Sequence, residues 1–578
     1  MNLANSKTII IIVIIAAFLR FWQLGNNPPS LTWDEAAWGY NAYSLGIDGR
    51  DEHGRFLPLD YLESFGDFKP PLYAYLDIIP VKLFGLNEFA VRFPSAFFGV
   101  LTVLATYFLV REIFRRWEVR NEKLDKEVGS EKKSSHLSLQ NQASHIALLT
   151  SFILAISPWH INLSRAAFEA NVATFFIVLG VFLFLKATVN ASRSLASFTI
   201  LLISIASFVL SMYTFNTARV VVPLLLTVLL IGKIKILYKM KISLITALAI
   251  GFILFFPLVL FLKTPQSQLR FKEVNIFSDI GVIERTNQQM LNDRDTLLTR
   301  ILHNRRFAYT VEYLKHYFDH FKSSFLFING DGNPKFSTQD IGSLYLWDLP
   351  FFVLGILFIF RQRIGYWWFI PLWMIIGVAP AATARETPHV LRIESTLPTF
   401  QIFTAYGVFV FITTISKIKC QISKIQIKYL IFALSILFLI FNFSYYLHGY
   451  YMHYPREYSG EWQYGYKESI EFVKKQEQNF DEVKITTELG RPYIYYLFYT
   501  KTNPEKFRKT AKIEREVFGF VNVEKLGKYS FAKDLNPMAN KSKKILYVDI
   551  KNKAPDNAKI LQTFYLLNGN PALVAYEI

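Results

Sequence analysis

The sequence predicts an α-helical polytopic membrane protein with a small α/β domain at its carboxyl end. The chain has 578 residues, of which 52% are hydrophobic and 16% aromatic. This composition is too apolar for a soluble protein of this length and indicates several membrane spans. The formal net charge is +18, and the basic residues cluster in short loops between apolar runs. That pattern is typical of the cytoplasmic loops of membrane proteins and does not indicate nucleic-acid binding.

Eleven apolar runs are long enough to cross a hydrocarbon core of about 30 Å. The first run follows Lys7 and lacks a small-residue cleavage site, so we expect a retained span with a cytoplasmic amino end. The expected spans lie near residues 8–24, 90–111, 144–161, 169–188, 195–213, 217–232, 241–262, 344–360, 366–382, 396–416 and 428–447.

A twelfth run, 72–85, is short and contains Asp77, Pro80 and Lys82. It fits an amphipathic helix lying in the membrane interface better than a span. Loop charge supports this choice, because eleven spans place the most basic short loops in the cytoplasm. Those loops are 111–133, 186–193, 233–241, 361–363 and 417–428. The loops 25–89, 162–168, 263–343 and 384–395 and the tail are then external.

The tail, 450–578, changes character and predicts a soluble extracytoplasmic domain that follows a membrane-embedded domain, 1–449. Residues 462–476 and 492–499 have helical character, whereas 482–487 and 544–550 are typical of strands. About 130 residues suffice for a small α/β domain. The tail contains neither a phosphate-binding glycine loop nor a nucleophile motif.

Two adjacent acids, Asp34 and Glu35, follow the first span at the point where the chain meets water. Carboxylates so close to lipid are costly and usually have a function. Adjacent acids in an extended segment point to opposite sides, so we expect one to accept a proton while the other holds a loop or a cation. The alternative is a surface turn in which an acid caps the helix that begins near Ala36.

The same external loop contains Asp67, Lys69 and two prolines, and the earlier motif Asp51–Arg55. Lysine is a compact cation suited to a phosphate group, and the prolines suit the first turn of the next helix. The alternative for Lys69 is snorkelling to lipid head groups. His53 is a candidate metal ligand, but no ligand spacing supports this role.

Two further external turns carry charged side chains. Arg165 and Glu169 are four residues apart, so they share a face if the segment is helical. The alternative is a local ion pair. The loop 384–395 contains Arg385, His389 and Arg392, which suit an anionic lipid phosphate or make generic head-group contacts.

With these motifs the chain resembles the protein O-mannosyltransferase and aminoarabinose-transferase family of membrane glycosyltransferases, which use polyprenyl-phosphate sugars. The resemblance covers about residues 8–450. Its carriers are TWDE at 32–35, DEHGR at 51–55, FKPPLYAYL at 68–76, FAVRFPSAFFG at 89–99, SPWHINLSRAAFEAN at 157–171 and TPHVLR at 387–392. The lumenal repeat domains of the mannosyltransferase branch are missing from this sequence, so a protein acceptor is not implied.

The resemblance implies an inverting transfer from a polyprenyl-phosphate sugar to a hydroxyl of a protein, lipid or glycan, outside a bacterial cytoplasmic membrane. By motif, Asp34 matches the family's catalytic acid, Lys69 matches its lysine in the KP motif, and Glu169 matches its second acidic residue. The chemistry agrees, because a departing phosphate needs cationic stabilisation and the acceptor needs a base. A second carboxylate, Glu35 or Glu169, can orient the acceptor or a bound cation.

The predicted site residues fall into three groups. The catalytic candidates are Asp34, Glu35 and Glu169; the donor-phosphate candidates are Lys69, Arg165, His389 and Arg392; the other candidates are Asp67, His53 and Arg385. The expected partners are the lipid-linked sugar and membrane lipids, with no nucleic acid. No cofactor is assigned, and a divalent cation is left open.

Two other functions use related substrates. A polysaccharide ligase or polymerase also consumes lipid-linked sugars, and only a donor assay separates it from a glycosyltransferase. A transporter of lipid-linked sugars predicts ionisable residues inside the spans and a repeated half. Most of the predicted spans lack central charges, and their acids lie at the external ends.

Overall fold

The computed structural model describes residues 3–127, 142–189, 194–294, 296–417, 422–515, 521–537 and 543–578. The chain divides into two compact units. Unit 1 contains Met1–Leu19, Phe98–Leu163 and Ala170–Tyr446, and unit 2 contains Arg20–Phe97, Ser164–Glu169 and Leu447–Ile578. The loop 25–89, which we call the first external loop after its predicted location, and the tail therefore belong to the same unit, although they lie near opposite ends of the sequence.

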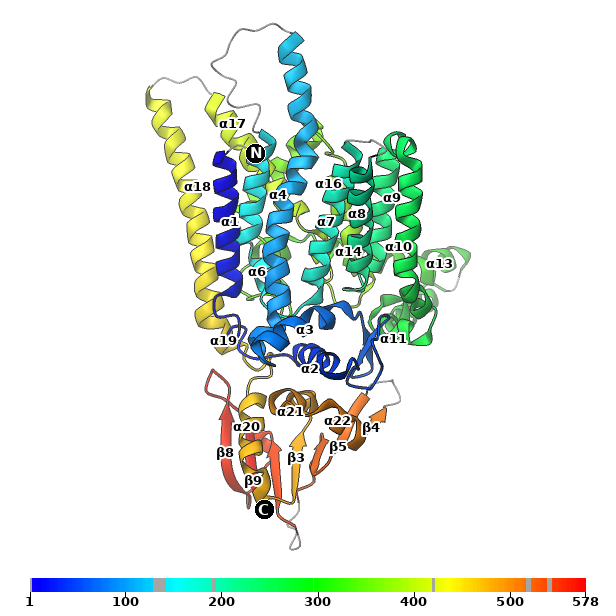
Figure 1. Ribbon diagram of the computed structural model, residues 1–578, viewed down its shortest axis with the longest axis vertical. Helices are drawn as coiled ribbons and strands as arrows, with labels where there is room; N and C mark the ends of the chain where they lie inside the picture. The colour runs from blue at the N-terminus through cyan, green and yellow to red at the C-terminus, as the bar shows by residue number, and fades with distance from the viewer. Residues whose placement is uncertain are drawn as a thin grey trace. The chain divides into compact units, whose positions relative to one another are not determined.

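Every one of the eleven predicted apolar runs coincides with helix, and the helices of unit 1 run side by side in Figure 1. The helices that carry these runs are α1 (Leu3–Phe21), α4 (Glu88–Glu127), α5 (Gln142–Ile156), α6 (Pro158–Ser164), α7 (Glu169–Val189), α8 (Leu195–Met212), α9 (Ala218–Leu237), α10 (Lys241–Leu262), α15 (Asp348–Gln362), α16 (Phe369–Val378), α17 (Thr399–Lys417) and α18 (Ile422–His448). The run 144–161 corresponds to α5 and α6 together, which are bent by 57°.

Within the described residues, five helices are long and apolar enough to cross a membrane, or six if α5 and α6 form one broken span. A helical polytopic membrane protein is therefore confirmed, whereas the count of eleven spans stays a prediction. Part of the difference arises because α9 and α10 are counted as one helix of 45 residues, Ala218–Leu262. Two further helices are short. Helix α16 has only 10 residues and ends just before Pro380, and α15 has 15 residues.

The long loop 263–343 is largely helical. It contains α11 (Pro265–Val274), α12 (Ile280–Asn292), α13 (Leu297–Leu302), α14 (Arg305–Asp319) and a π-helical turn at Ser324–Ile328. Side-chain caps begin three of these helices, because Asp279, Thr296 and Asn304 accept hydrogen bonds from backbone N–H groups of the first turns.

Unit 2 begins with the first external loop, which forms α2 (Trp33–Asp48), a hairpin of β1 (Leu62–Ser64) and β2 (Asp67–Lys69), and α3 (Leu72–Phe84). The predicted helix over 72–85 is present as α3. Its 13 residues are too few to span a bilayer. Its place in the membrane interface stays a prediction.

The tail forms the predicted α/β arrangement. Helices α20 (Tyr466–Gln476) and α21 (Pro492–Thr500) and strands β3 (Glu482–Thr486) and β7 (Ile545–Asp549) match the four expected elements. The other elements are α22 (Pro504–Thr510), β4 (Ala511–Arg515), β5 (Val521–Leu526), β6 (Tyr529–Ala532), β8 (Lys559–Tyr565) and β9 (Pro571–Glu577). The described strands form one sheet of order β4-β5-β6-β3-β7-β9-β8, in which β3 runs parallel to β6 and β7.

Polar contacts join the tail to the first external loop within unit 2. The Tyr495 hydroxyl donates to the Leu31 carbonyl over 3.0 Å, and the Tyr40 hydroxyl donates to the Thr502 carbonyl over 3.0 Å. Helix α21 also packs against α2, as Figure 1 shows. The predicted domain boundary at 449/450 lies close to the entry into unit 2 at Leu447, but unit 2 also takes in the first external loop.

The loop charges predict that 263–343 and the tail face outward and that the loop after α15 faces the cytoplasm. Exposed positions suited to a test are Asp340, Asn568 and Arg361. In a Cys420→Ala background, we expect Asp340→Cys and Asn568→Cys to react with an impermeant maleimide on intact cells. Arg361→Cys, the control, should react only after permeabilisation. The reverse pattern would contradict the topology.

Candidate functional site

The two adjacent acids lie in the first turn of α2, which corrects the expectation of an extended segment. Thr32 is the N-cap residue. Its Oγ1 accepts from the Glu35 N–H over 3.2 Å, and the Thr32 N–H donates to Glu35 Oε2 over 2.9 Å. This capping box follows from the spacing Thr-x-x-Glu, a signal available in the sequence. Asp34 and Glu35 still diverge, because successive helical residues are about 100° apart.

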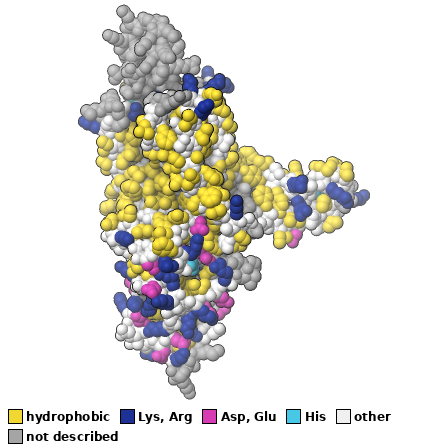
Figure 2. Space-filling model, turned by 45° about the vertical axis from the view of Figure 1, so that its right-hand side comes forward, with side chains coloured by type: hydrophobic (Ala, Val, Ile, Leu, Met, Phe, Trp, Pro, Cys, Tyr) yellow, Lys and Arg dark blue, Asp and Glu magenta, His cyan; other side chains and the backbone are white. Residues whose placement is uncertain are grey.

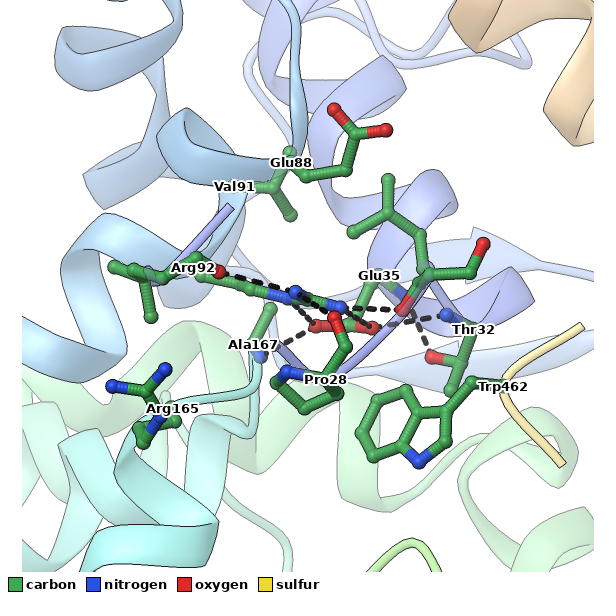
Figure 3. A network of polar contacts seen from close by, with 12 residues as sticks. Pro28, Thr32, Glu35, Glu88, Val91, Arg92, Arg165, Ala167 and Trp462 are labelled. Atoms are coloured by element: carbon green, nitrogen blue, oxygen red, sulfur yellow. Dashed lines mark hydrogen bonds and ion pairs between the residues drawn. The ribbon is translucent and has the colours of Figure 1, made fainter. Parts of the chain in front are cut away.

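Glu35 is buried in a network that occupies both of its oxygens (Figure 3). Arg92 Nε donates to Glu35 Oε1 over 2.9 Å, and Arg92 Nη2 donates to Oε2 over 3.4 Å. The backbone N–H of Ala167 donates to Oε1 over 3.0 Å. Glu35 therefore connects α2 with α4 and with the turn 164–169, and both of its carboxylate oxygens accept hydrogen bonds within the protein.

Arg92 is the residue that the sequence analysis missed. Its side chain is fully buried, and Nη1 donates to the carbonyls of Leu24, over 3.1 Å, and Pro28, over 2.8 Å. Nη2 also donates to the Ser30 carbonyl, and the guanidinium lies 5.8 Å from the Trp462 ring centroid. An arginine within the apolar run FAVRFPSAFFG was the available signal, because such a charge needs a partner.

Arg165 was predicted to bind the donor phosphate, but its guanidinium is fully buried and directed at protein acceptors. Nε donates to the Tyr450 hydroxyl over 3.1 Å, Nη1 to the Arg20 carbonyl over 3.2 Å and Nη2 to the Asn27 carbonyl over 2.9 Å. All three nitrogens are thus engaged. The geometry favours a role in holding the segment after the first span, near Glu35 (Figure 3).

Asp34, in contrast, is accessible, and it pairs with Lys69. The Lys69 ammonium donates to Asp34 Oδ1, and the two side chains are 10% and 51% exposed, respectively. The aromatic rings of Trp38 and Phe65 flank the ammonium at 5.2 and 5.6 Å. Burial by itself lowers the pKa of the Lys69 ammonium, but the carboxylates of Asp34 and Asp67 outweigh it and raise that pKa above its ordinary value. The lysine is therefore charged at neutral pH.

Two more predicted acids lie within electrostatic range of Lys69. Asp67 is two residues before it in β2, and Glu169 is the first residue of α7. The structure therefore brings Asp34, Asp67 and Glu169 around one ammonium. Over the residues that the structure describes, no group of three or more His, Cys, Asp or Glu side chains is arranged to hold a metal ion.

His53 lies in a tight turn closed by Asp51, whose Oδ1 accepts the N–H groups of His53, over 3.0 Å, and Arg55, over 2.9 Å. The His53 ring nitrogen Nε2 is 3.7 Å from Glu52 Oε1. Burial raises the pKa of both Asp51 and Glu52. These contacts are those of a structural histidine in a hydrogen-bonded turn.

A second cluster lies within unit 1, where His389 and Arg392 meet residues of the long loop 263–343. His389 Nδ1 is 3.6 Å from Asp331 Oδ2, and that carboxylate accepts the Val390 N–H over 2.7 Å. Burial raises the pKa of Asp331 to about 6. Burial also lowers the pKa of His320 to about 4, and burial together with Arg392 and His320 lowers the pKa of His389. Both imidazoles are therefore neutral at pH 7.

His320 was not predicted, because a histidine at the end of a helix in a long loop gives no distinctive sequence signal. Arg385, which was predicted, bridges two loops instead. Its Nε donates to the Asn275 carbonyl over 3.2 Å, and its backbone N–H donates to the Val274 carbonyl over 2.8 Å. Arg392 keeps a side chain that is 20% exposed and donates to the Glu386 carbonyl over 3.0 Å.

Part of the chain is similar to known proteins. Residues 10–119 match the family model of dolichyl-phosphate-mannose-protein mannosyltransferases, a segment that includes Asp34, Lys69 and Arg92. An uncharacterized protein of Aquifex aeolicus (strain VF5) is 28% identical over 179 residues, which are 31% of this chain and 29% of that protein. The chain thus aligns with less than a third of that relative's length.

Two solved structures share the fold. ArnT from Cupriavidus metallidurans in the apo state is 12% identical to this chain, with a TM-score of 0.52. The match covers 99% of this chain and 98% of the ArnT chain. The Archaeoglobus fulgidus oligosaccharyltransferase in the apo form is 13% identical to this chain, with a TM-score of 0.50. The match covers 86% of this chain and 63% of the oligosaccharyltransferase chain. The predicted resemblance to the mannosyltransferases is confirmed over residues 10–119, and the two solved structures show that the fold is shared.

Arg92 generates a stability prediction. Arg92→Met removes one partner of a buried ion pair and leaves the Glu35 carboxylate without its counter-ion, which typically costs about 3–5 kcal/mol. We expect a clear fall in the thermal unfolding midpoint of the protein in detergent. The matched control is Lys559→Met, which removes the cation of an exposed pair with Glu577. Equal midpoints for the two variants would contradict the role assigned to Arg92.

Proposed function

We propose that the protein is an inverting glycosyltransferase that moves a sugar from a polyprenyl-phosphate donor to an acceptor hydroxyl. The family match over residues 10–119 supports the kind of reaction, and the Asp34–Lys69 pair supports the chemistry. The acceptor class, whether protein, lipid or glycan, remains open in this proposal. We place the reaction outside the cytoplasmic membrane, consistent with the basic cytoplasmic loops of an eleven-span chain.

The observation that carries the proposal is the contrast between the two neighbouring acids. Glu35 is buried with both oxygens bonded, whereas half of the Asp34 side chain is accessible beside an ammonium group. A general base has to reach the acceptor hydroxyl, and only an accessible carboxylate can do so. The buried pair fixes the helix start from which Asp34 projects.

In the proposed reaction, Asp34 takes the proton of the acceptor hydroxyl as that oxygen attacks the anomeric carbon of the sugar. The bond between this carbon and the phosphate oxygen breaks through an oxocarbenium-like transition state, and polyprenyl phosphate leaves as an anion. Lys69 gives this anion a positive charge. When the donor phosphate competes for Lys69, the Asp34 carboxylate is released from its ion pair to accept the proton.

His389 and Arg392 form our second candidate for a donor-phosphate contact. The neighbouring His320 is neutral at pH 7, and its one N–H donates from Nδ1 to the His316 carbonyl over 2.8 Å. The neutral imidazole of His389 carries one N–H donor, and the Arg392 guanidinium carries several. Phosphate oxygens are preferred partners for such donors. Glu169 is assigned to positioning the acceptor. Glu35, Arg92 and Arg165 are positioning residues that hold the first external loop.

The donor assay tests the proposal. Purified protein is incubated with radiolabelled polyprenyl-phosphate mannose or polyprenyl-phosphate aminoarabinose, and the release of polyprenyl phosphate is measured. We expect one donor to be consumed with inversion at the anomeric carbon. Transfer of preassembled chains instead of single sugars indicates a ligase or polymerase. Movement of the intact donor across proteoliposomes without cleavage indicates a transporter and overturns the proposal.

The base assignment predicts a large kinetic effect at Asp34. Asp34→Asn keeps the size of the side chain but cannot accept a proton at neutral pH, so turnover should fall by roughly 10²-fold or more. Donor binding, measured separately, should be largely kept. Glu169→Gln should slow transfer less. Normal turnover by Asp34→Asn, with Glu169→Gln inactive, would show that the base is misassigned.

The phosphate assignment predicts weaker use of the donor. Lys69→Ala and Arg392→Ala should each lower kcat/KM for the donor by roughly 10²-fold, the usual scale for one lost contact to a developing anion. Lys69→Arg should not restore activity, because the guanidinium fork has a different shape. The control is Lys322→Ala, an exposed cation of the same loop as His320. Wild-type donor kinetics for both test variants would refute the assignment.

A further inference from the structure

A segment of unit 1, residues 280–306, exposes apolar and basic side chains together, and we call it the arm. The arm contains α12, α13 and the start of α14. Leu297, Leu298 and Ile301 of α13 are 81%, 63% and 62% exposed, respectively. Soluble surfaces rarely display such a contiguous group of large apolar side chains. The arm therefore needs a partner with an apolar surface.

The apolar surface continues along α14. Phe307, Val311, Leu314 and Phe318 recur at intervals of four, three and four residues and are all exposed, which places them on one face of the helix. The other side of α14 is fixed to α16, because the hydroxyls of Tyr313 and Tyr317 donate to the carbonyls of Ala379 and Ile375. These four exposed residues, which we call the α14 stripe, thus lie on a helix that is fixed to the end of the apolar helix α16 and that follows α13 in the chain.

The charge of the arm indicates the nature of the partner. The sequence 280–306 contains five arginines, at 285, 294, 300, 305 and 306, against three acids, at 284, 293 and 295. Figure 2 shows hydrophobic and basic side chains together on a projection at the height where Figure 1 labels α13. A helical segment that combines an apolar face with arginines is typical of the interface of an anionic membrane.

A cavity in the arm supplies the second observation. It has a volume of about 410 Å³ and lies between α12 and the start of α14. Its lining residues are Ile283, Asn287, Met290, Arg300, His303, Asn304 and Arg305. His303 Nε2 is 2.8 Å from Asp293 Oδ2, so this imidazole is held beside the two arginines. The lining combines the guanidinium and amide donors of Arg300, Arg305 and Asn304 with the apolar side chains of Ile283 and Met290. Such a lining suits a phosphate that carries an apolar tail.

We propose that the arm binds the membrane surface, with α13 and the α14 stripe inserted among lipid chains and the cavity holding the phosphate of an anionic phospholipid. The residues that line the cavity include none of those assigned to the Asp34 site or to the His389 cluster, and the proposal does not depend on the proposed transferase activity. A free phosphate ion would explain the cavity but not the exposed leucines. The bilayer explains both.

The test measures where α13 lies. Leu298→Cys, in a Cys420→Ala background, is labelled with a fluorescent bimane, and the full chain is placed in nanodiscs of phosphatidylcholine with or without phosphatidylglycerol. We expect doxyl-labelled lipid to quench the label and aqueous iodide not to do so when phosphatidylglycerol is present. The same label at Asp340, an exposed position of unit 1, should be accessible to iodide in both nanodiscs.

Charge variants test the cavity. Arg300→Gln and Arg305→Gln should each weaken the preference for phosphatidylglycerol on the order of fivefold, the usual effect of one arginine near an anionic surface. Arg285→Gln is the matched control, because it removes an exposed arginine of α12 that does not line the cavity. It should weaken the preference less.

Two outcomes would overturn the proposal. The first is a label at Leu298 that iodide quenches freely in both nanodiscs, which would place α13 in water. The second is loss of the arginine effect when inorganic phosphate replaces chloride at equal ionic strength, which would make the cavity a site for free phosphate. Both outcomes are measured without an assay of sugar transfer, so they test the proposal independently of the proposed function.

Discussion

The buried ion pair between Glu35 and Arg92 is the interaction on which the candidate site depends. Removing two charges from water is expensive, and such a pair is tolerated only when hydrogen bonds satisfy its remaining atoms. Here Glu35 accepts from two nitrogens of Arg92 and from the backbone N–H groups of Thr32 and Ala167. The cost of burial is thus offset, and one carboxylate fixes three segments of the chain.

The ion pair between Glu35 and Arg92 also gives the two neighbouring acids, Asp34 and Glu35, different roles. Glu35 faces inward from the first turn of α2, so the preceding residue, Asp34, faces the accessible side and meets Lys69. Arg165 acts in parallel by binding the carbonyls of Arg20 and Asn27. The segment between the first span and α2 is therefore held from both of its ends. A base held in this way loses little freedom when a substrate binds, which favours catalysis.

The tail domain takes part in the same support. Trp462 lies against the Arg92 guanidinium, and Tyr495 binds the Leu31 carbonyl, one residue before the helix cap. Gly490 has φ of +129°, and a Cβ there would come within 2.7 Å of the Trp33 ring. Only glycine allows this close approach without strain. The tail domain is therefore part of the structure that positions Asp34.

Much of this architecture follows from the sequence. Apolar runs located the helices of unit 1. In the tail, alternation located β3 and the pattern of a buried strand located β7, because burial sets both patterns. The site was predicted less completely. Position and motif indicated Asp34, Lys69 and Glu169, which the structure brings together, while their roles stay predictions. Arg92 and His320 were missed, because a buried partner is defined by contacts between distant segments. Arg165 was assigned to phosphate because its burial cannot be read from its spacing.

The central claim is that Asp34 acts as the base while Glu35 only positions it, and chemical rescue tests this claim most directly. Asp34→Ala opens a small space beside Lys69 in which added formate can take the place of the lost carboxylate. The account predicts that formate restores part of the sugar transfer by Asp34→Ala and none of that by Glu35→Ala. Wild-type transfer by Asp34→Ala without formate, or rescue of Glu35→Ala by formate, would contradict it.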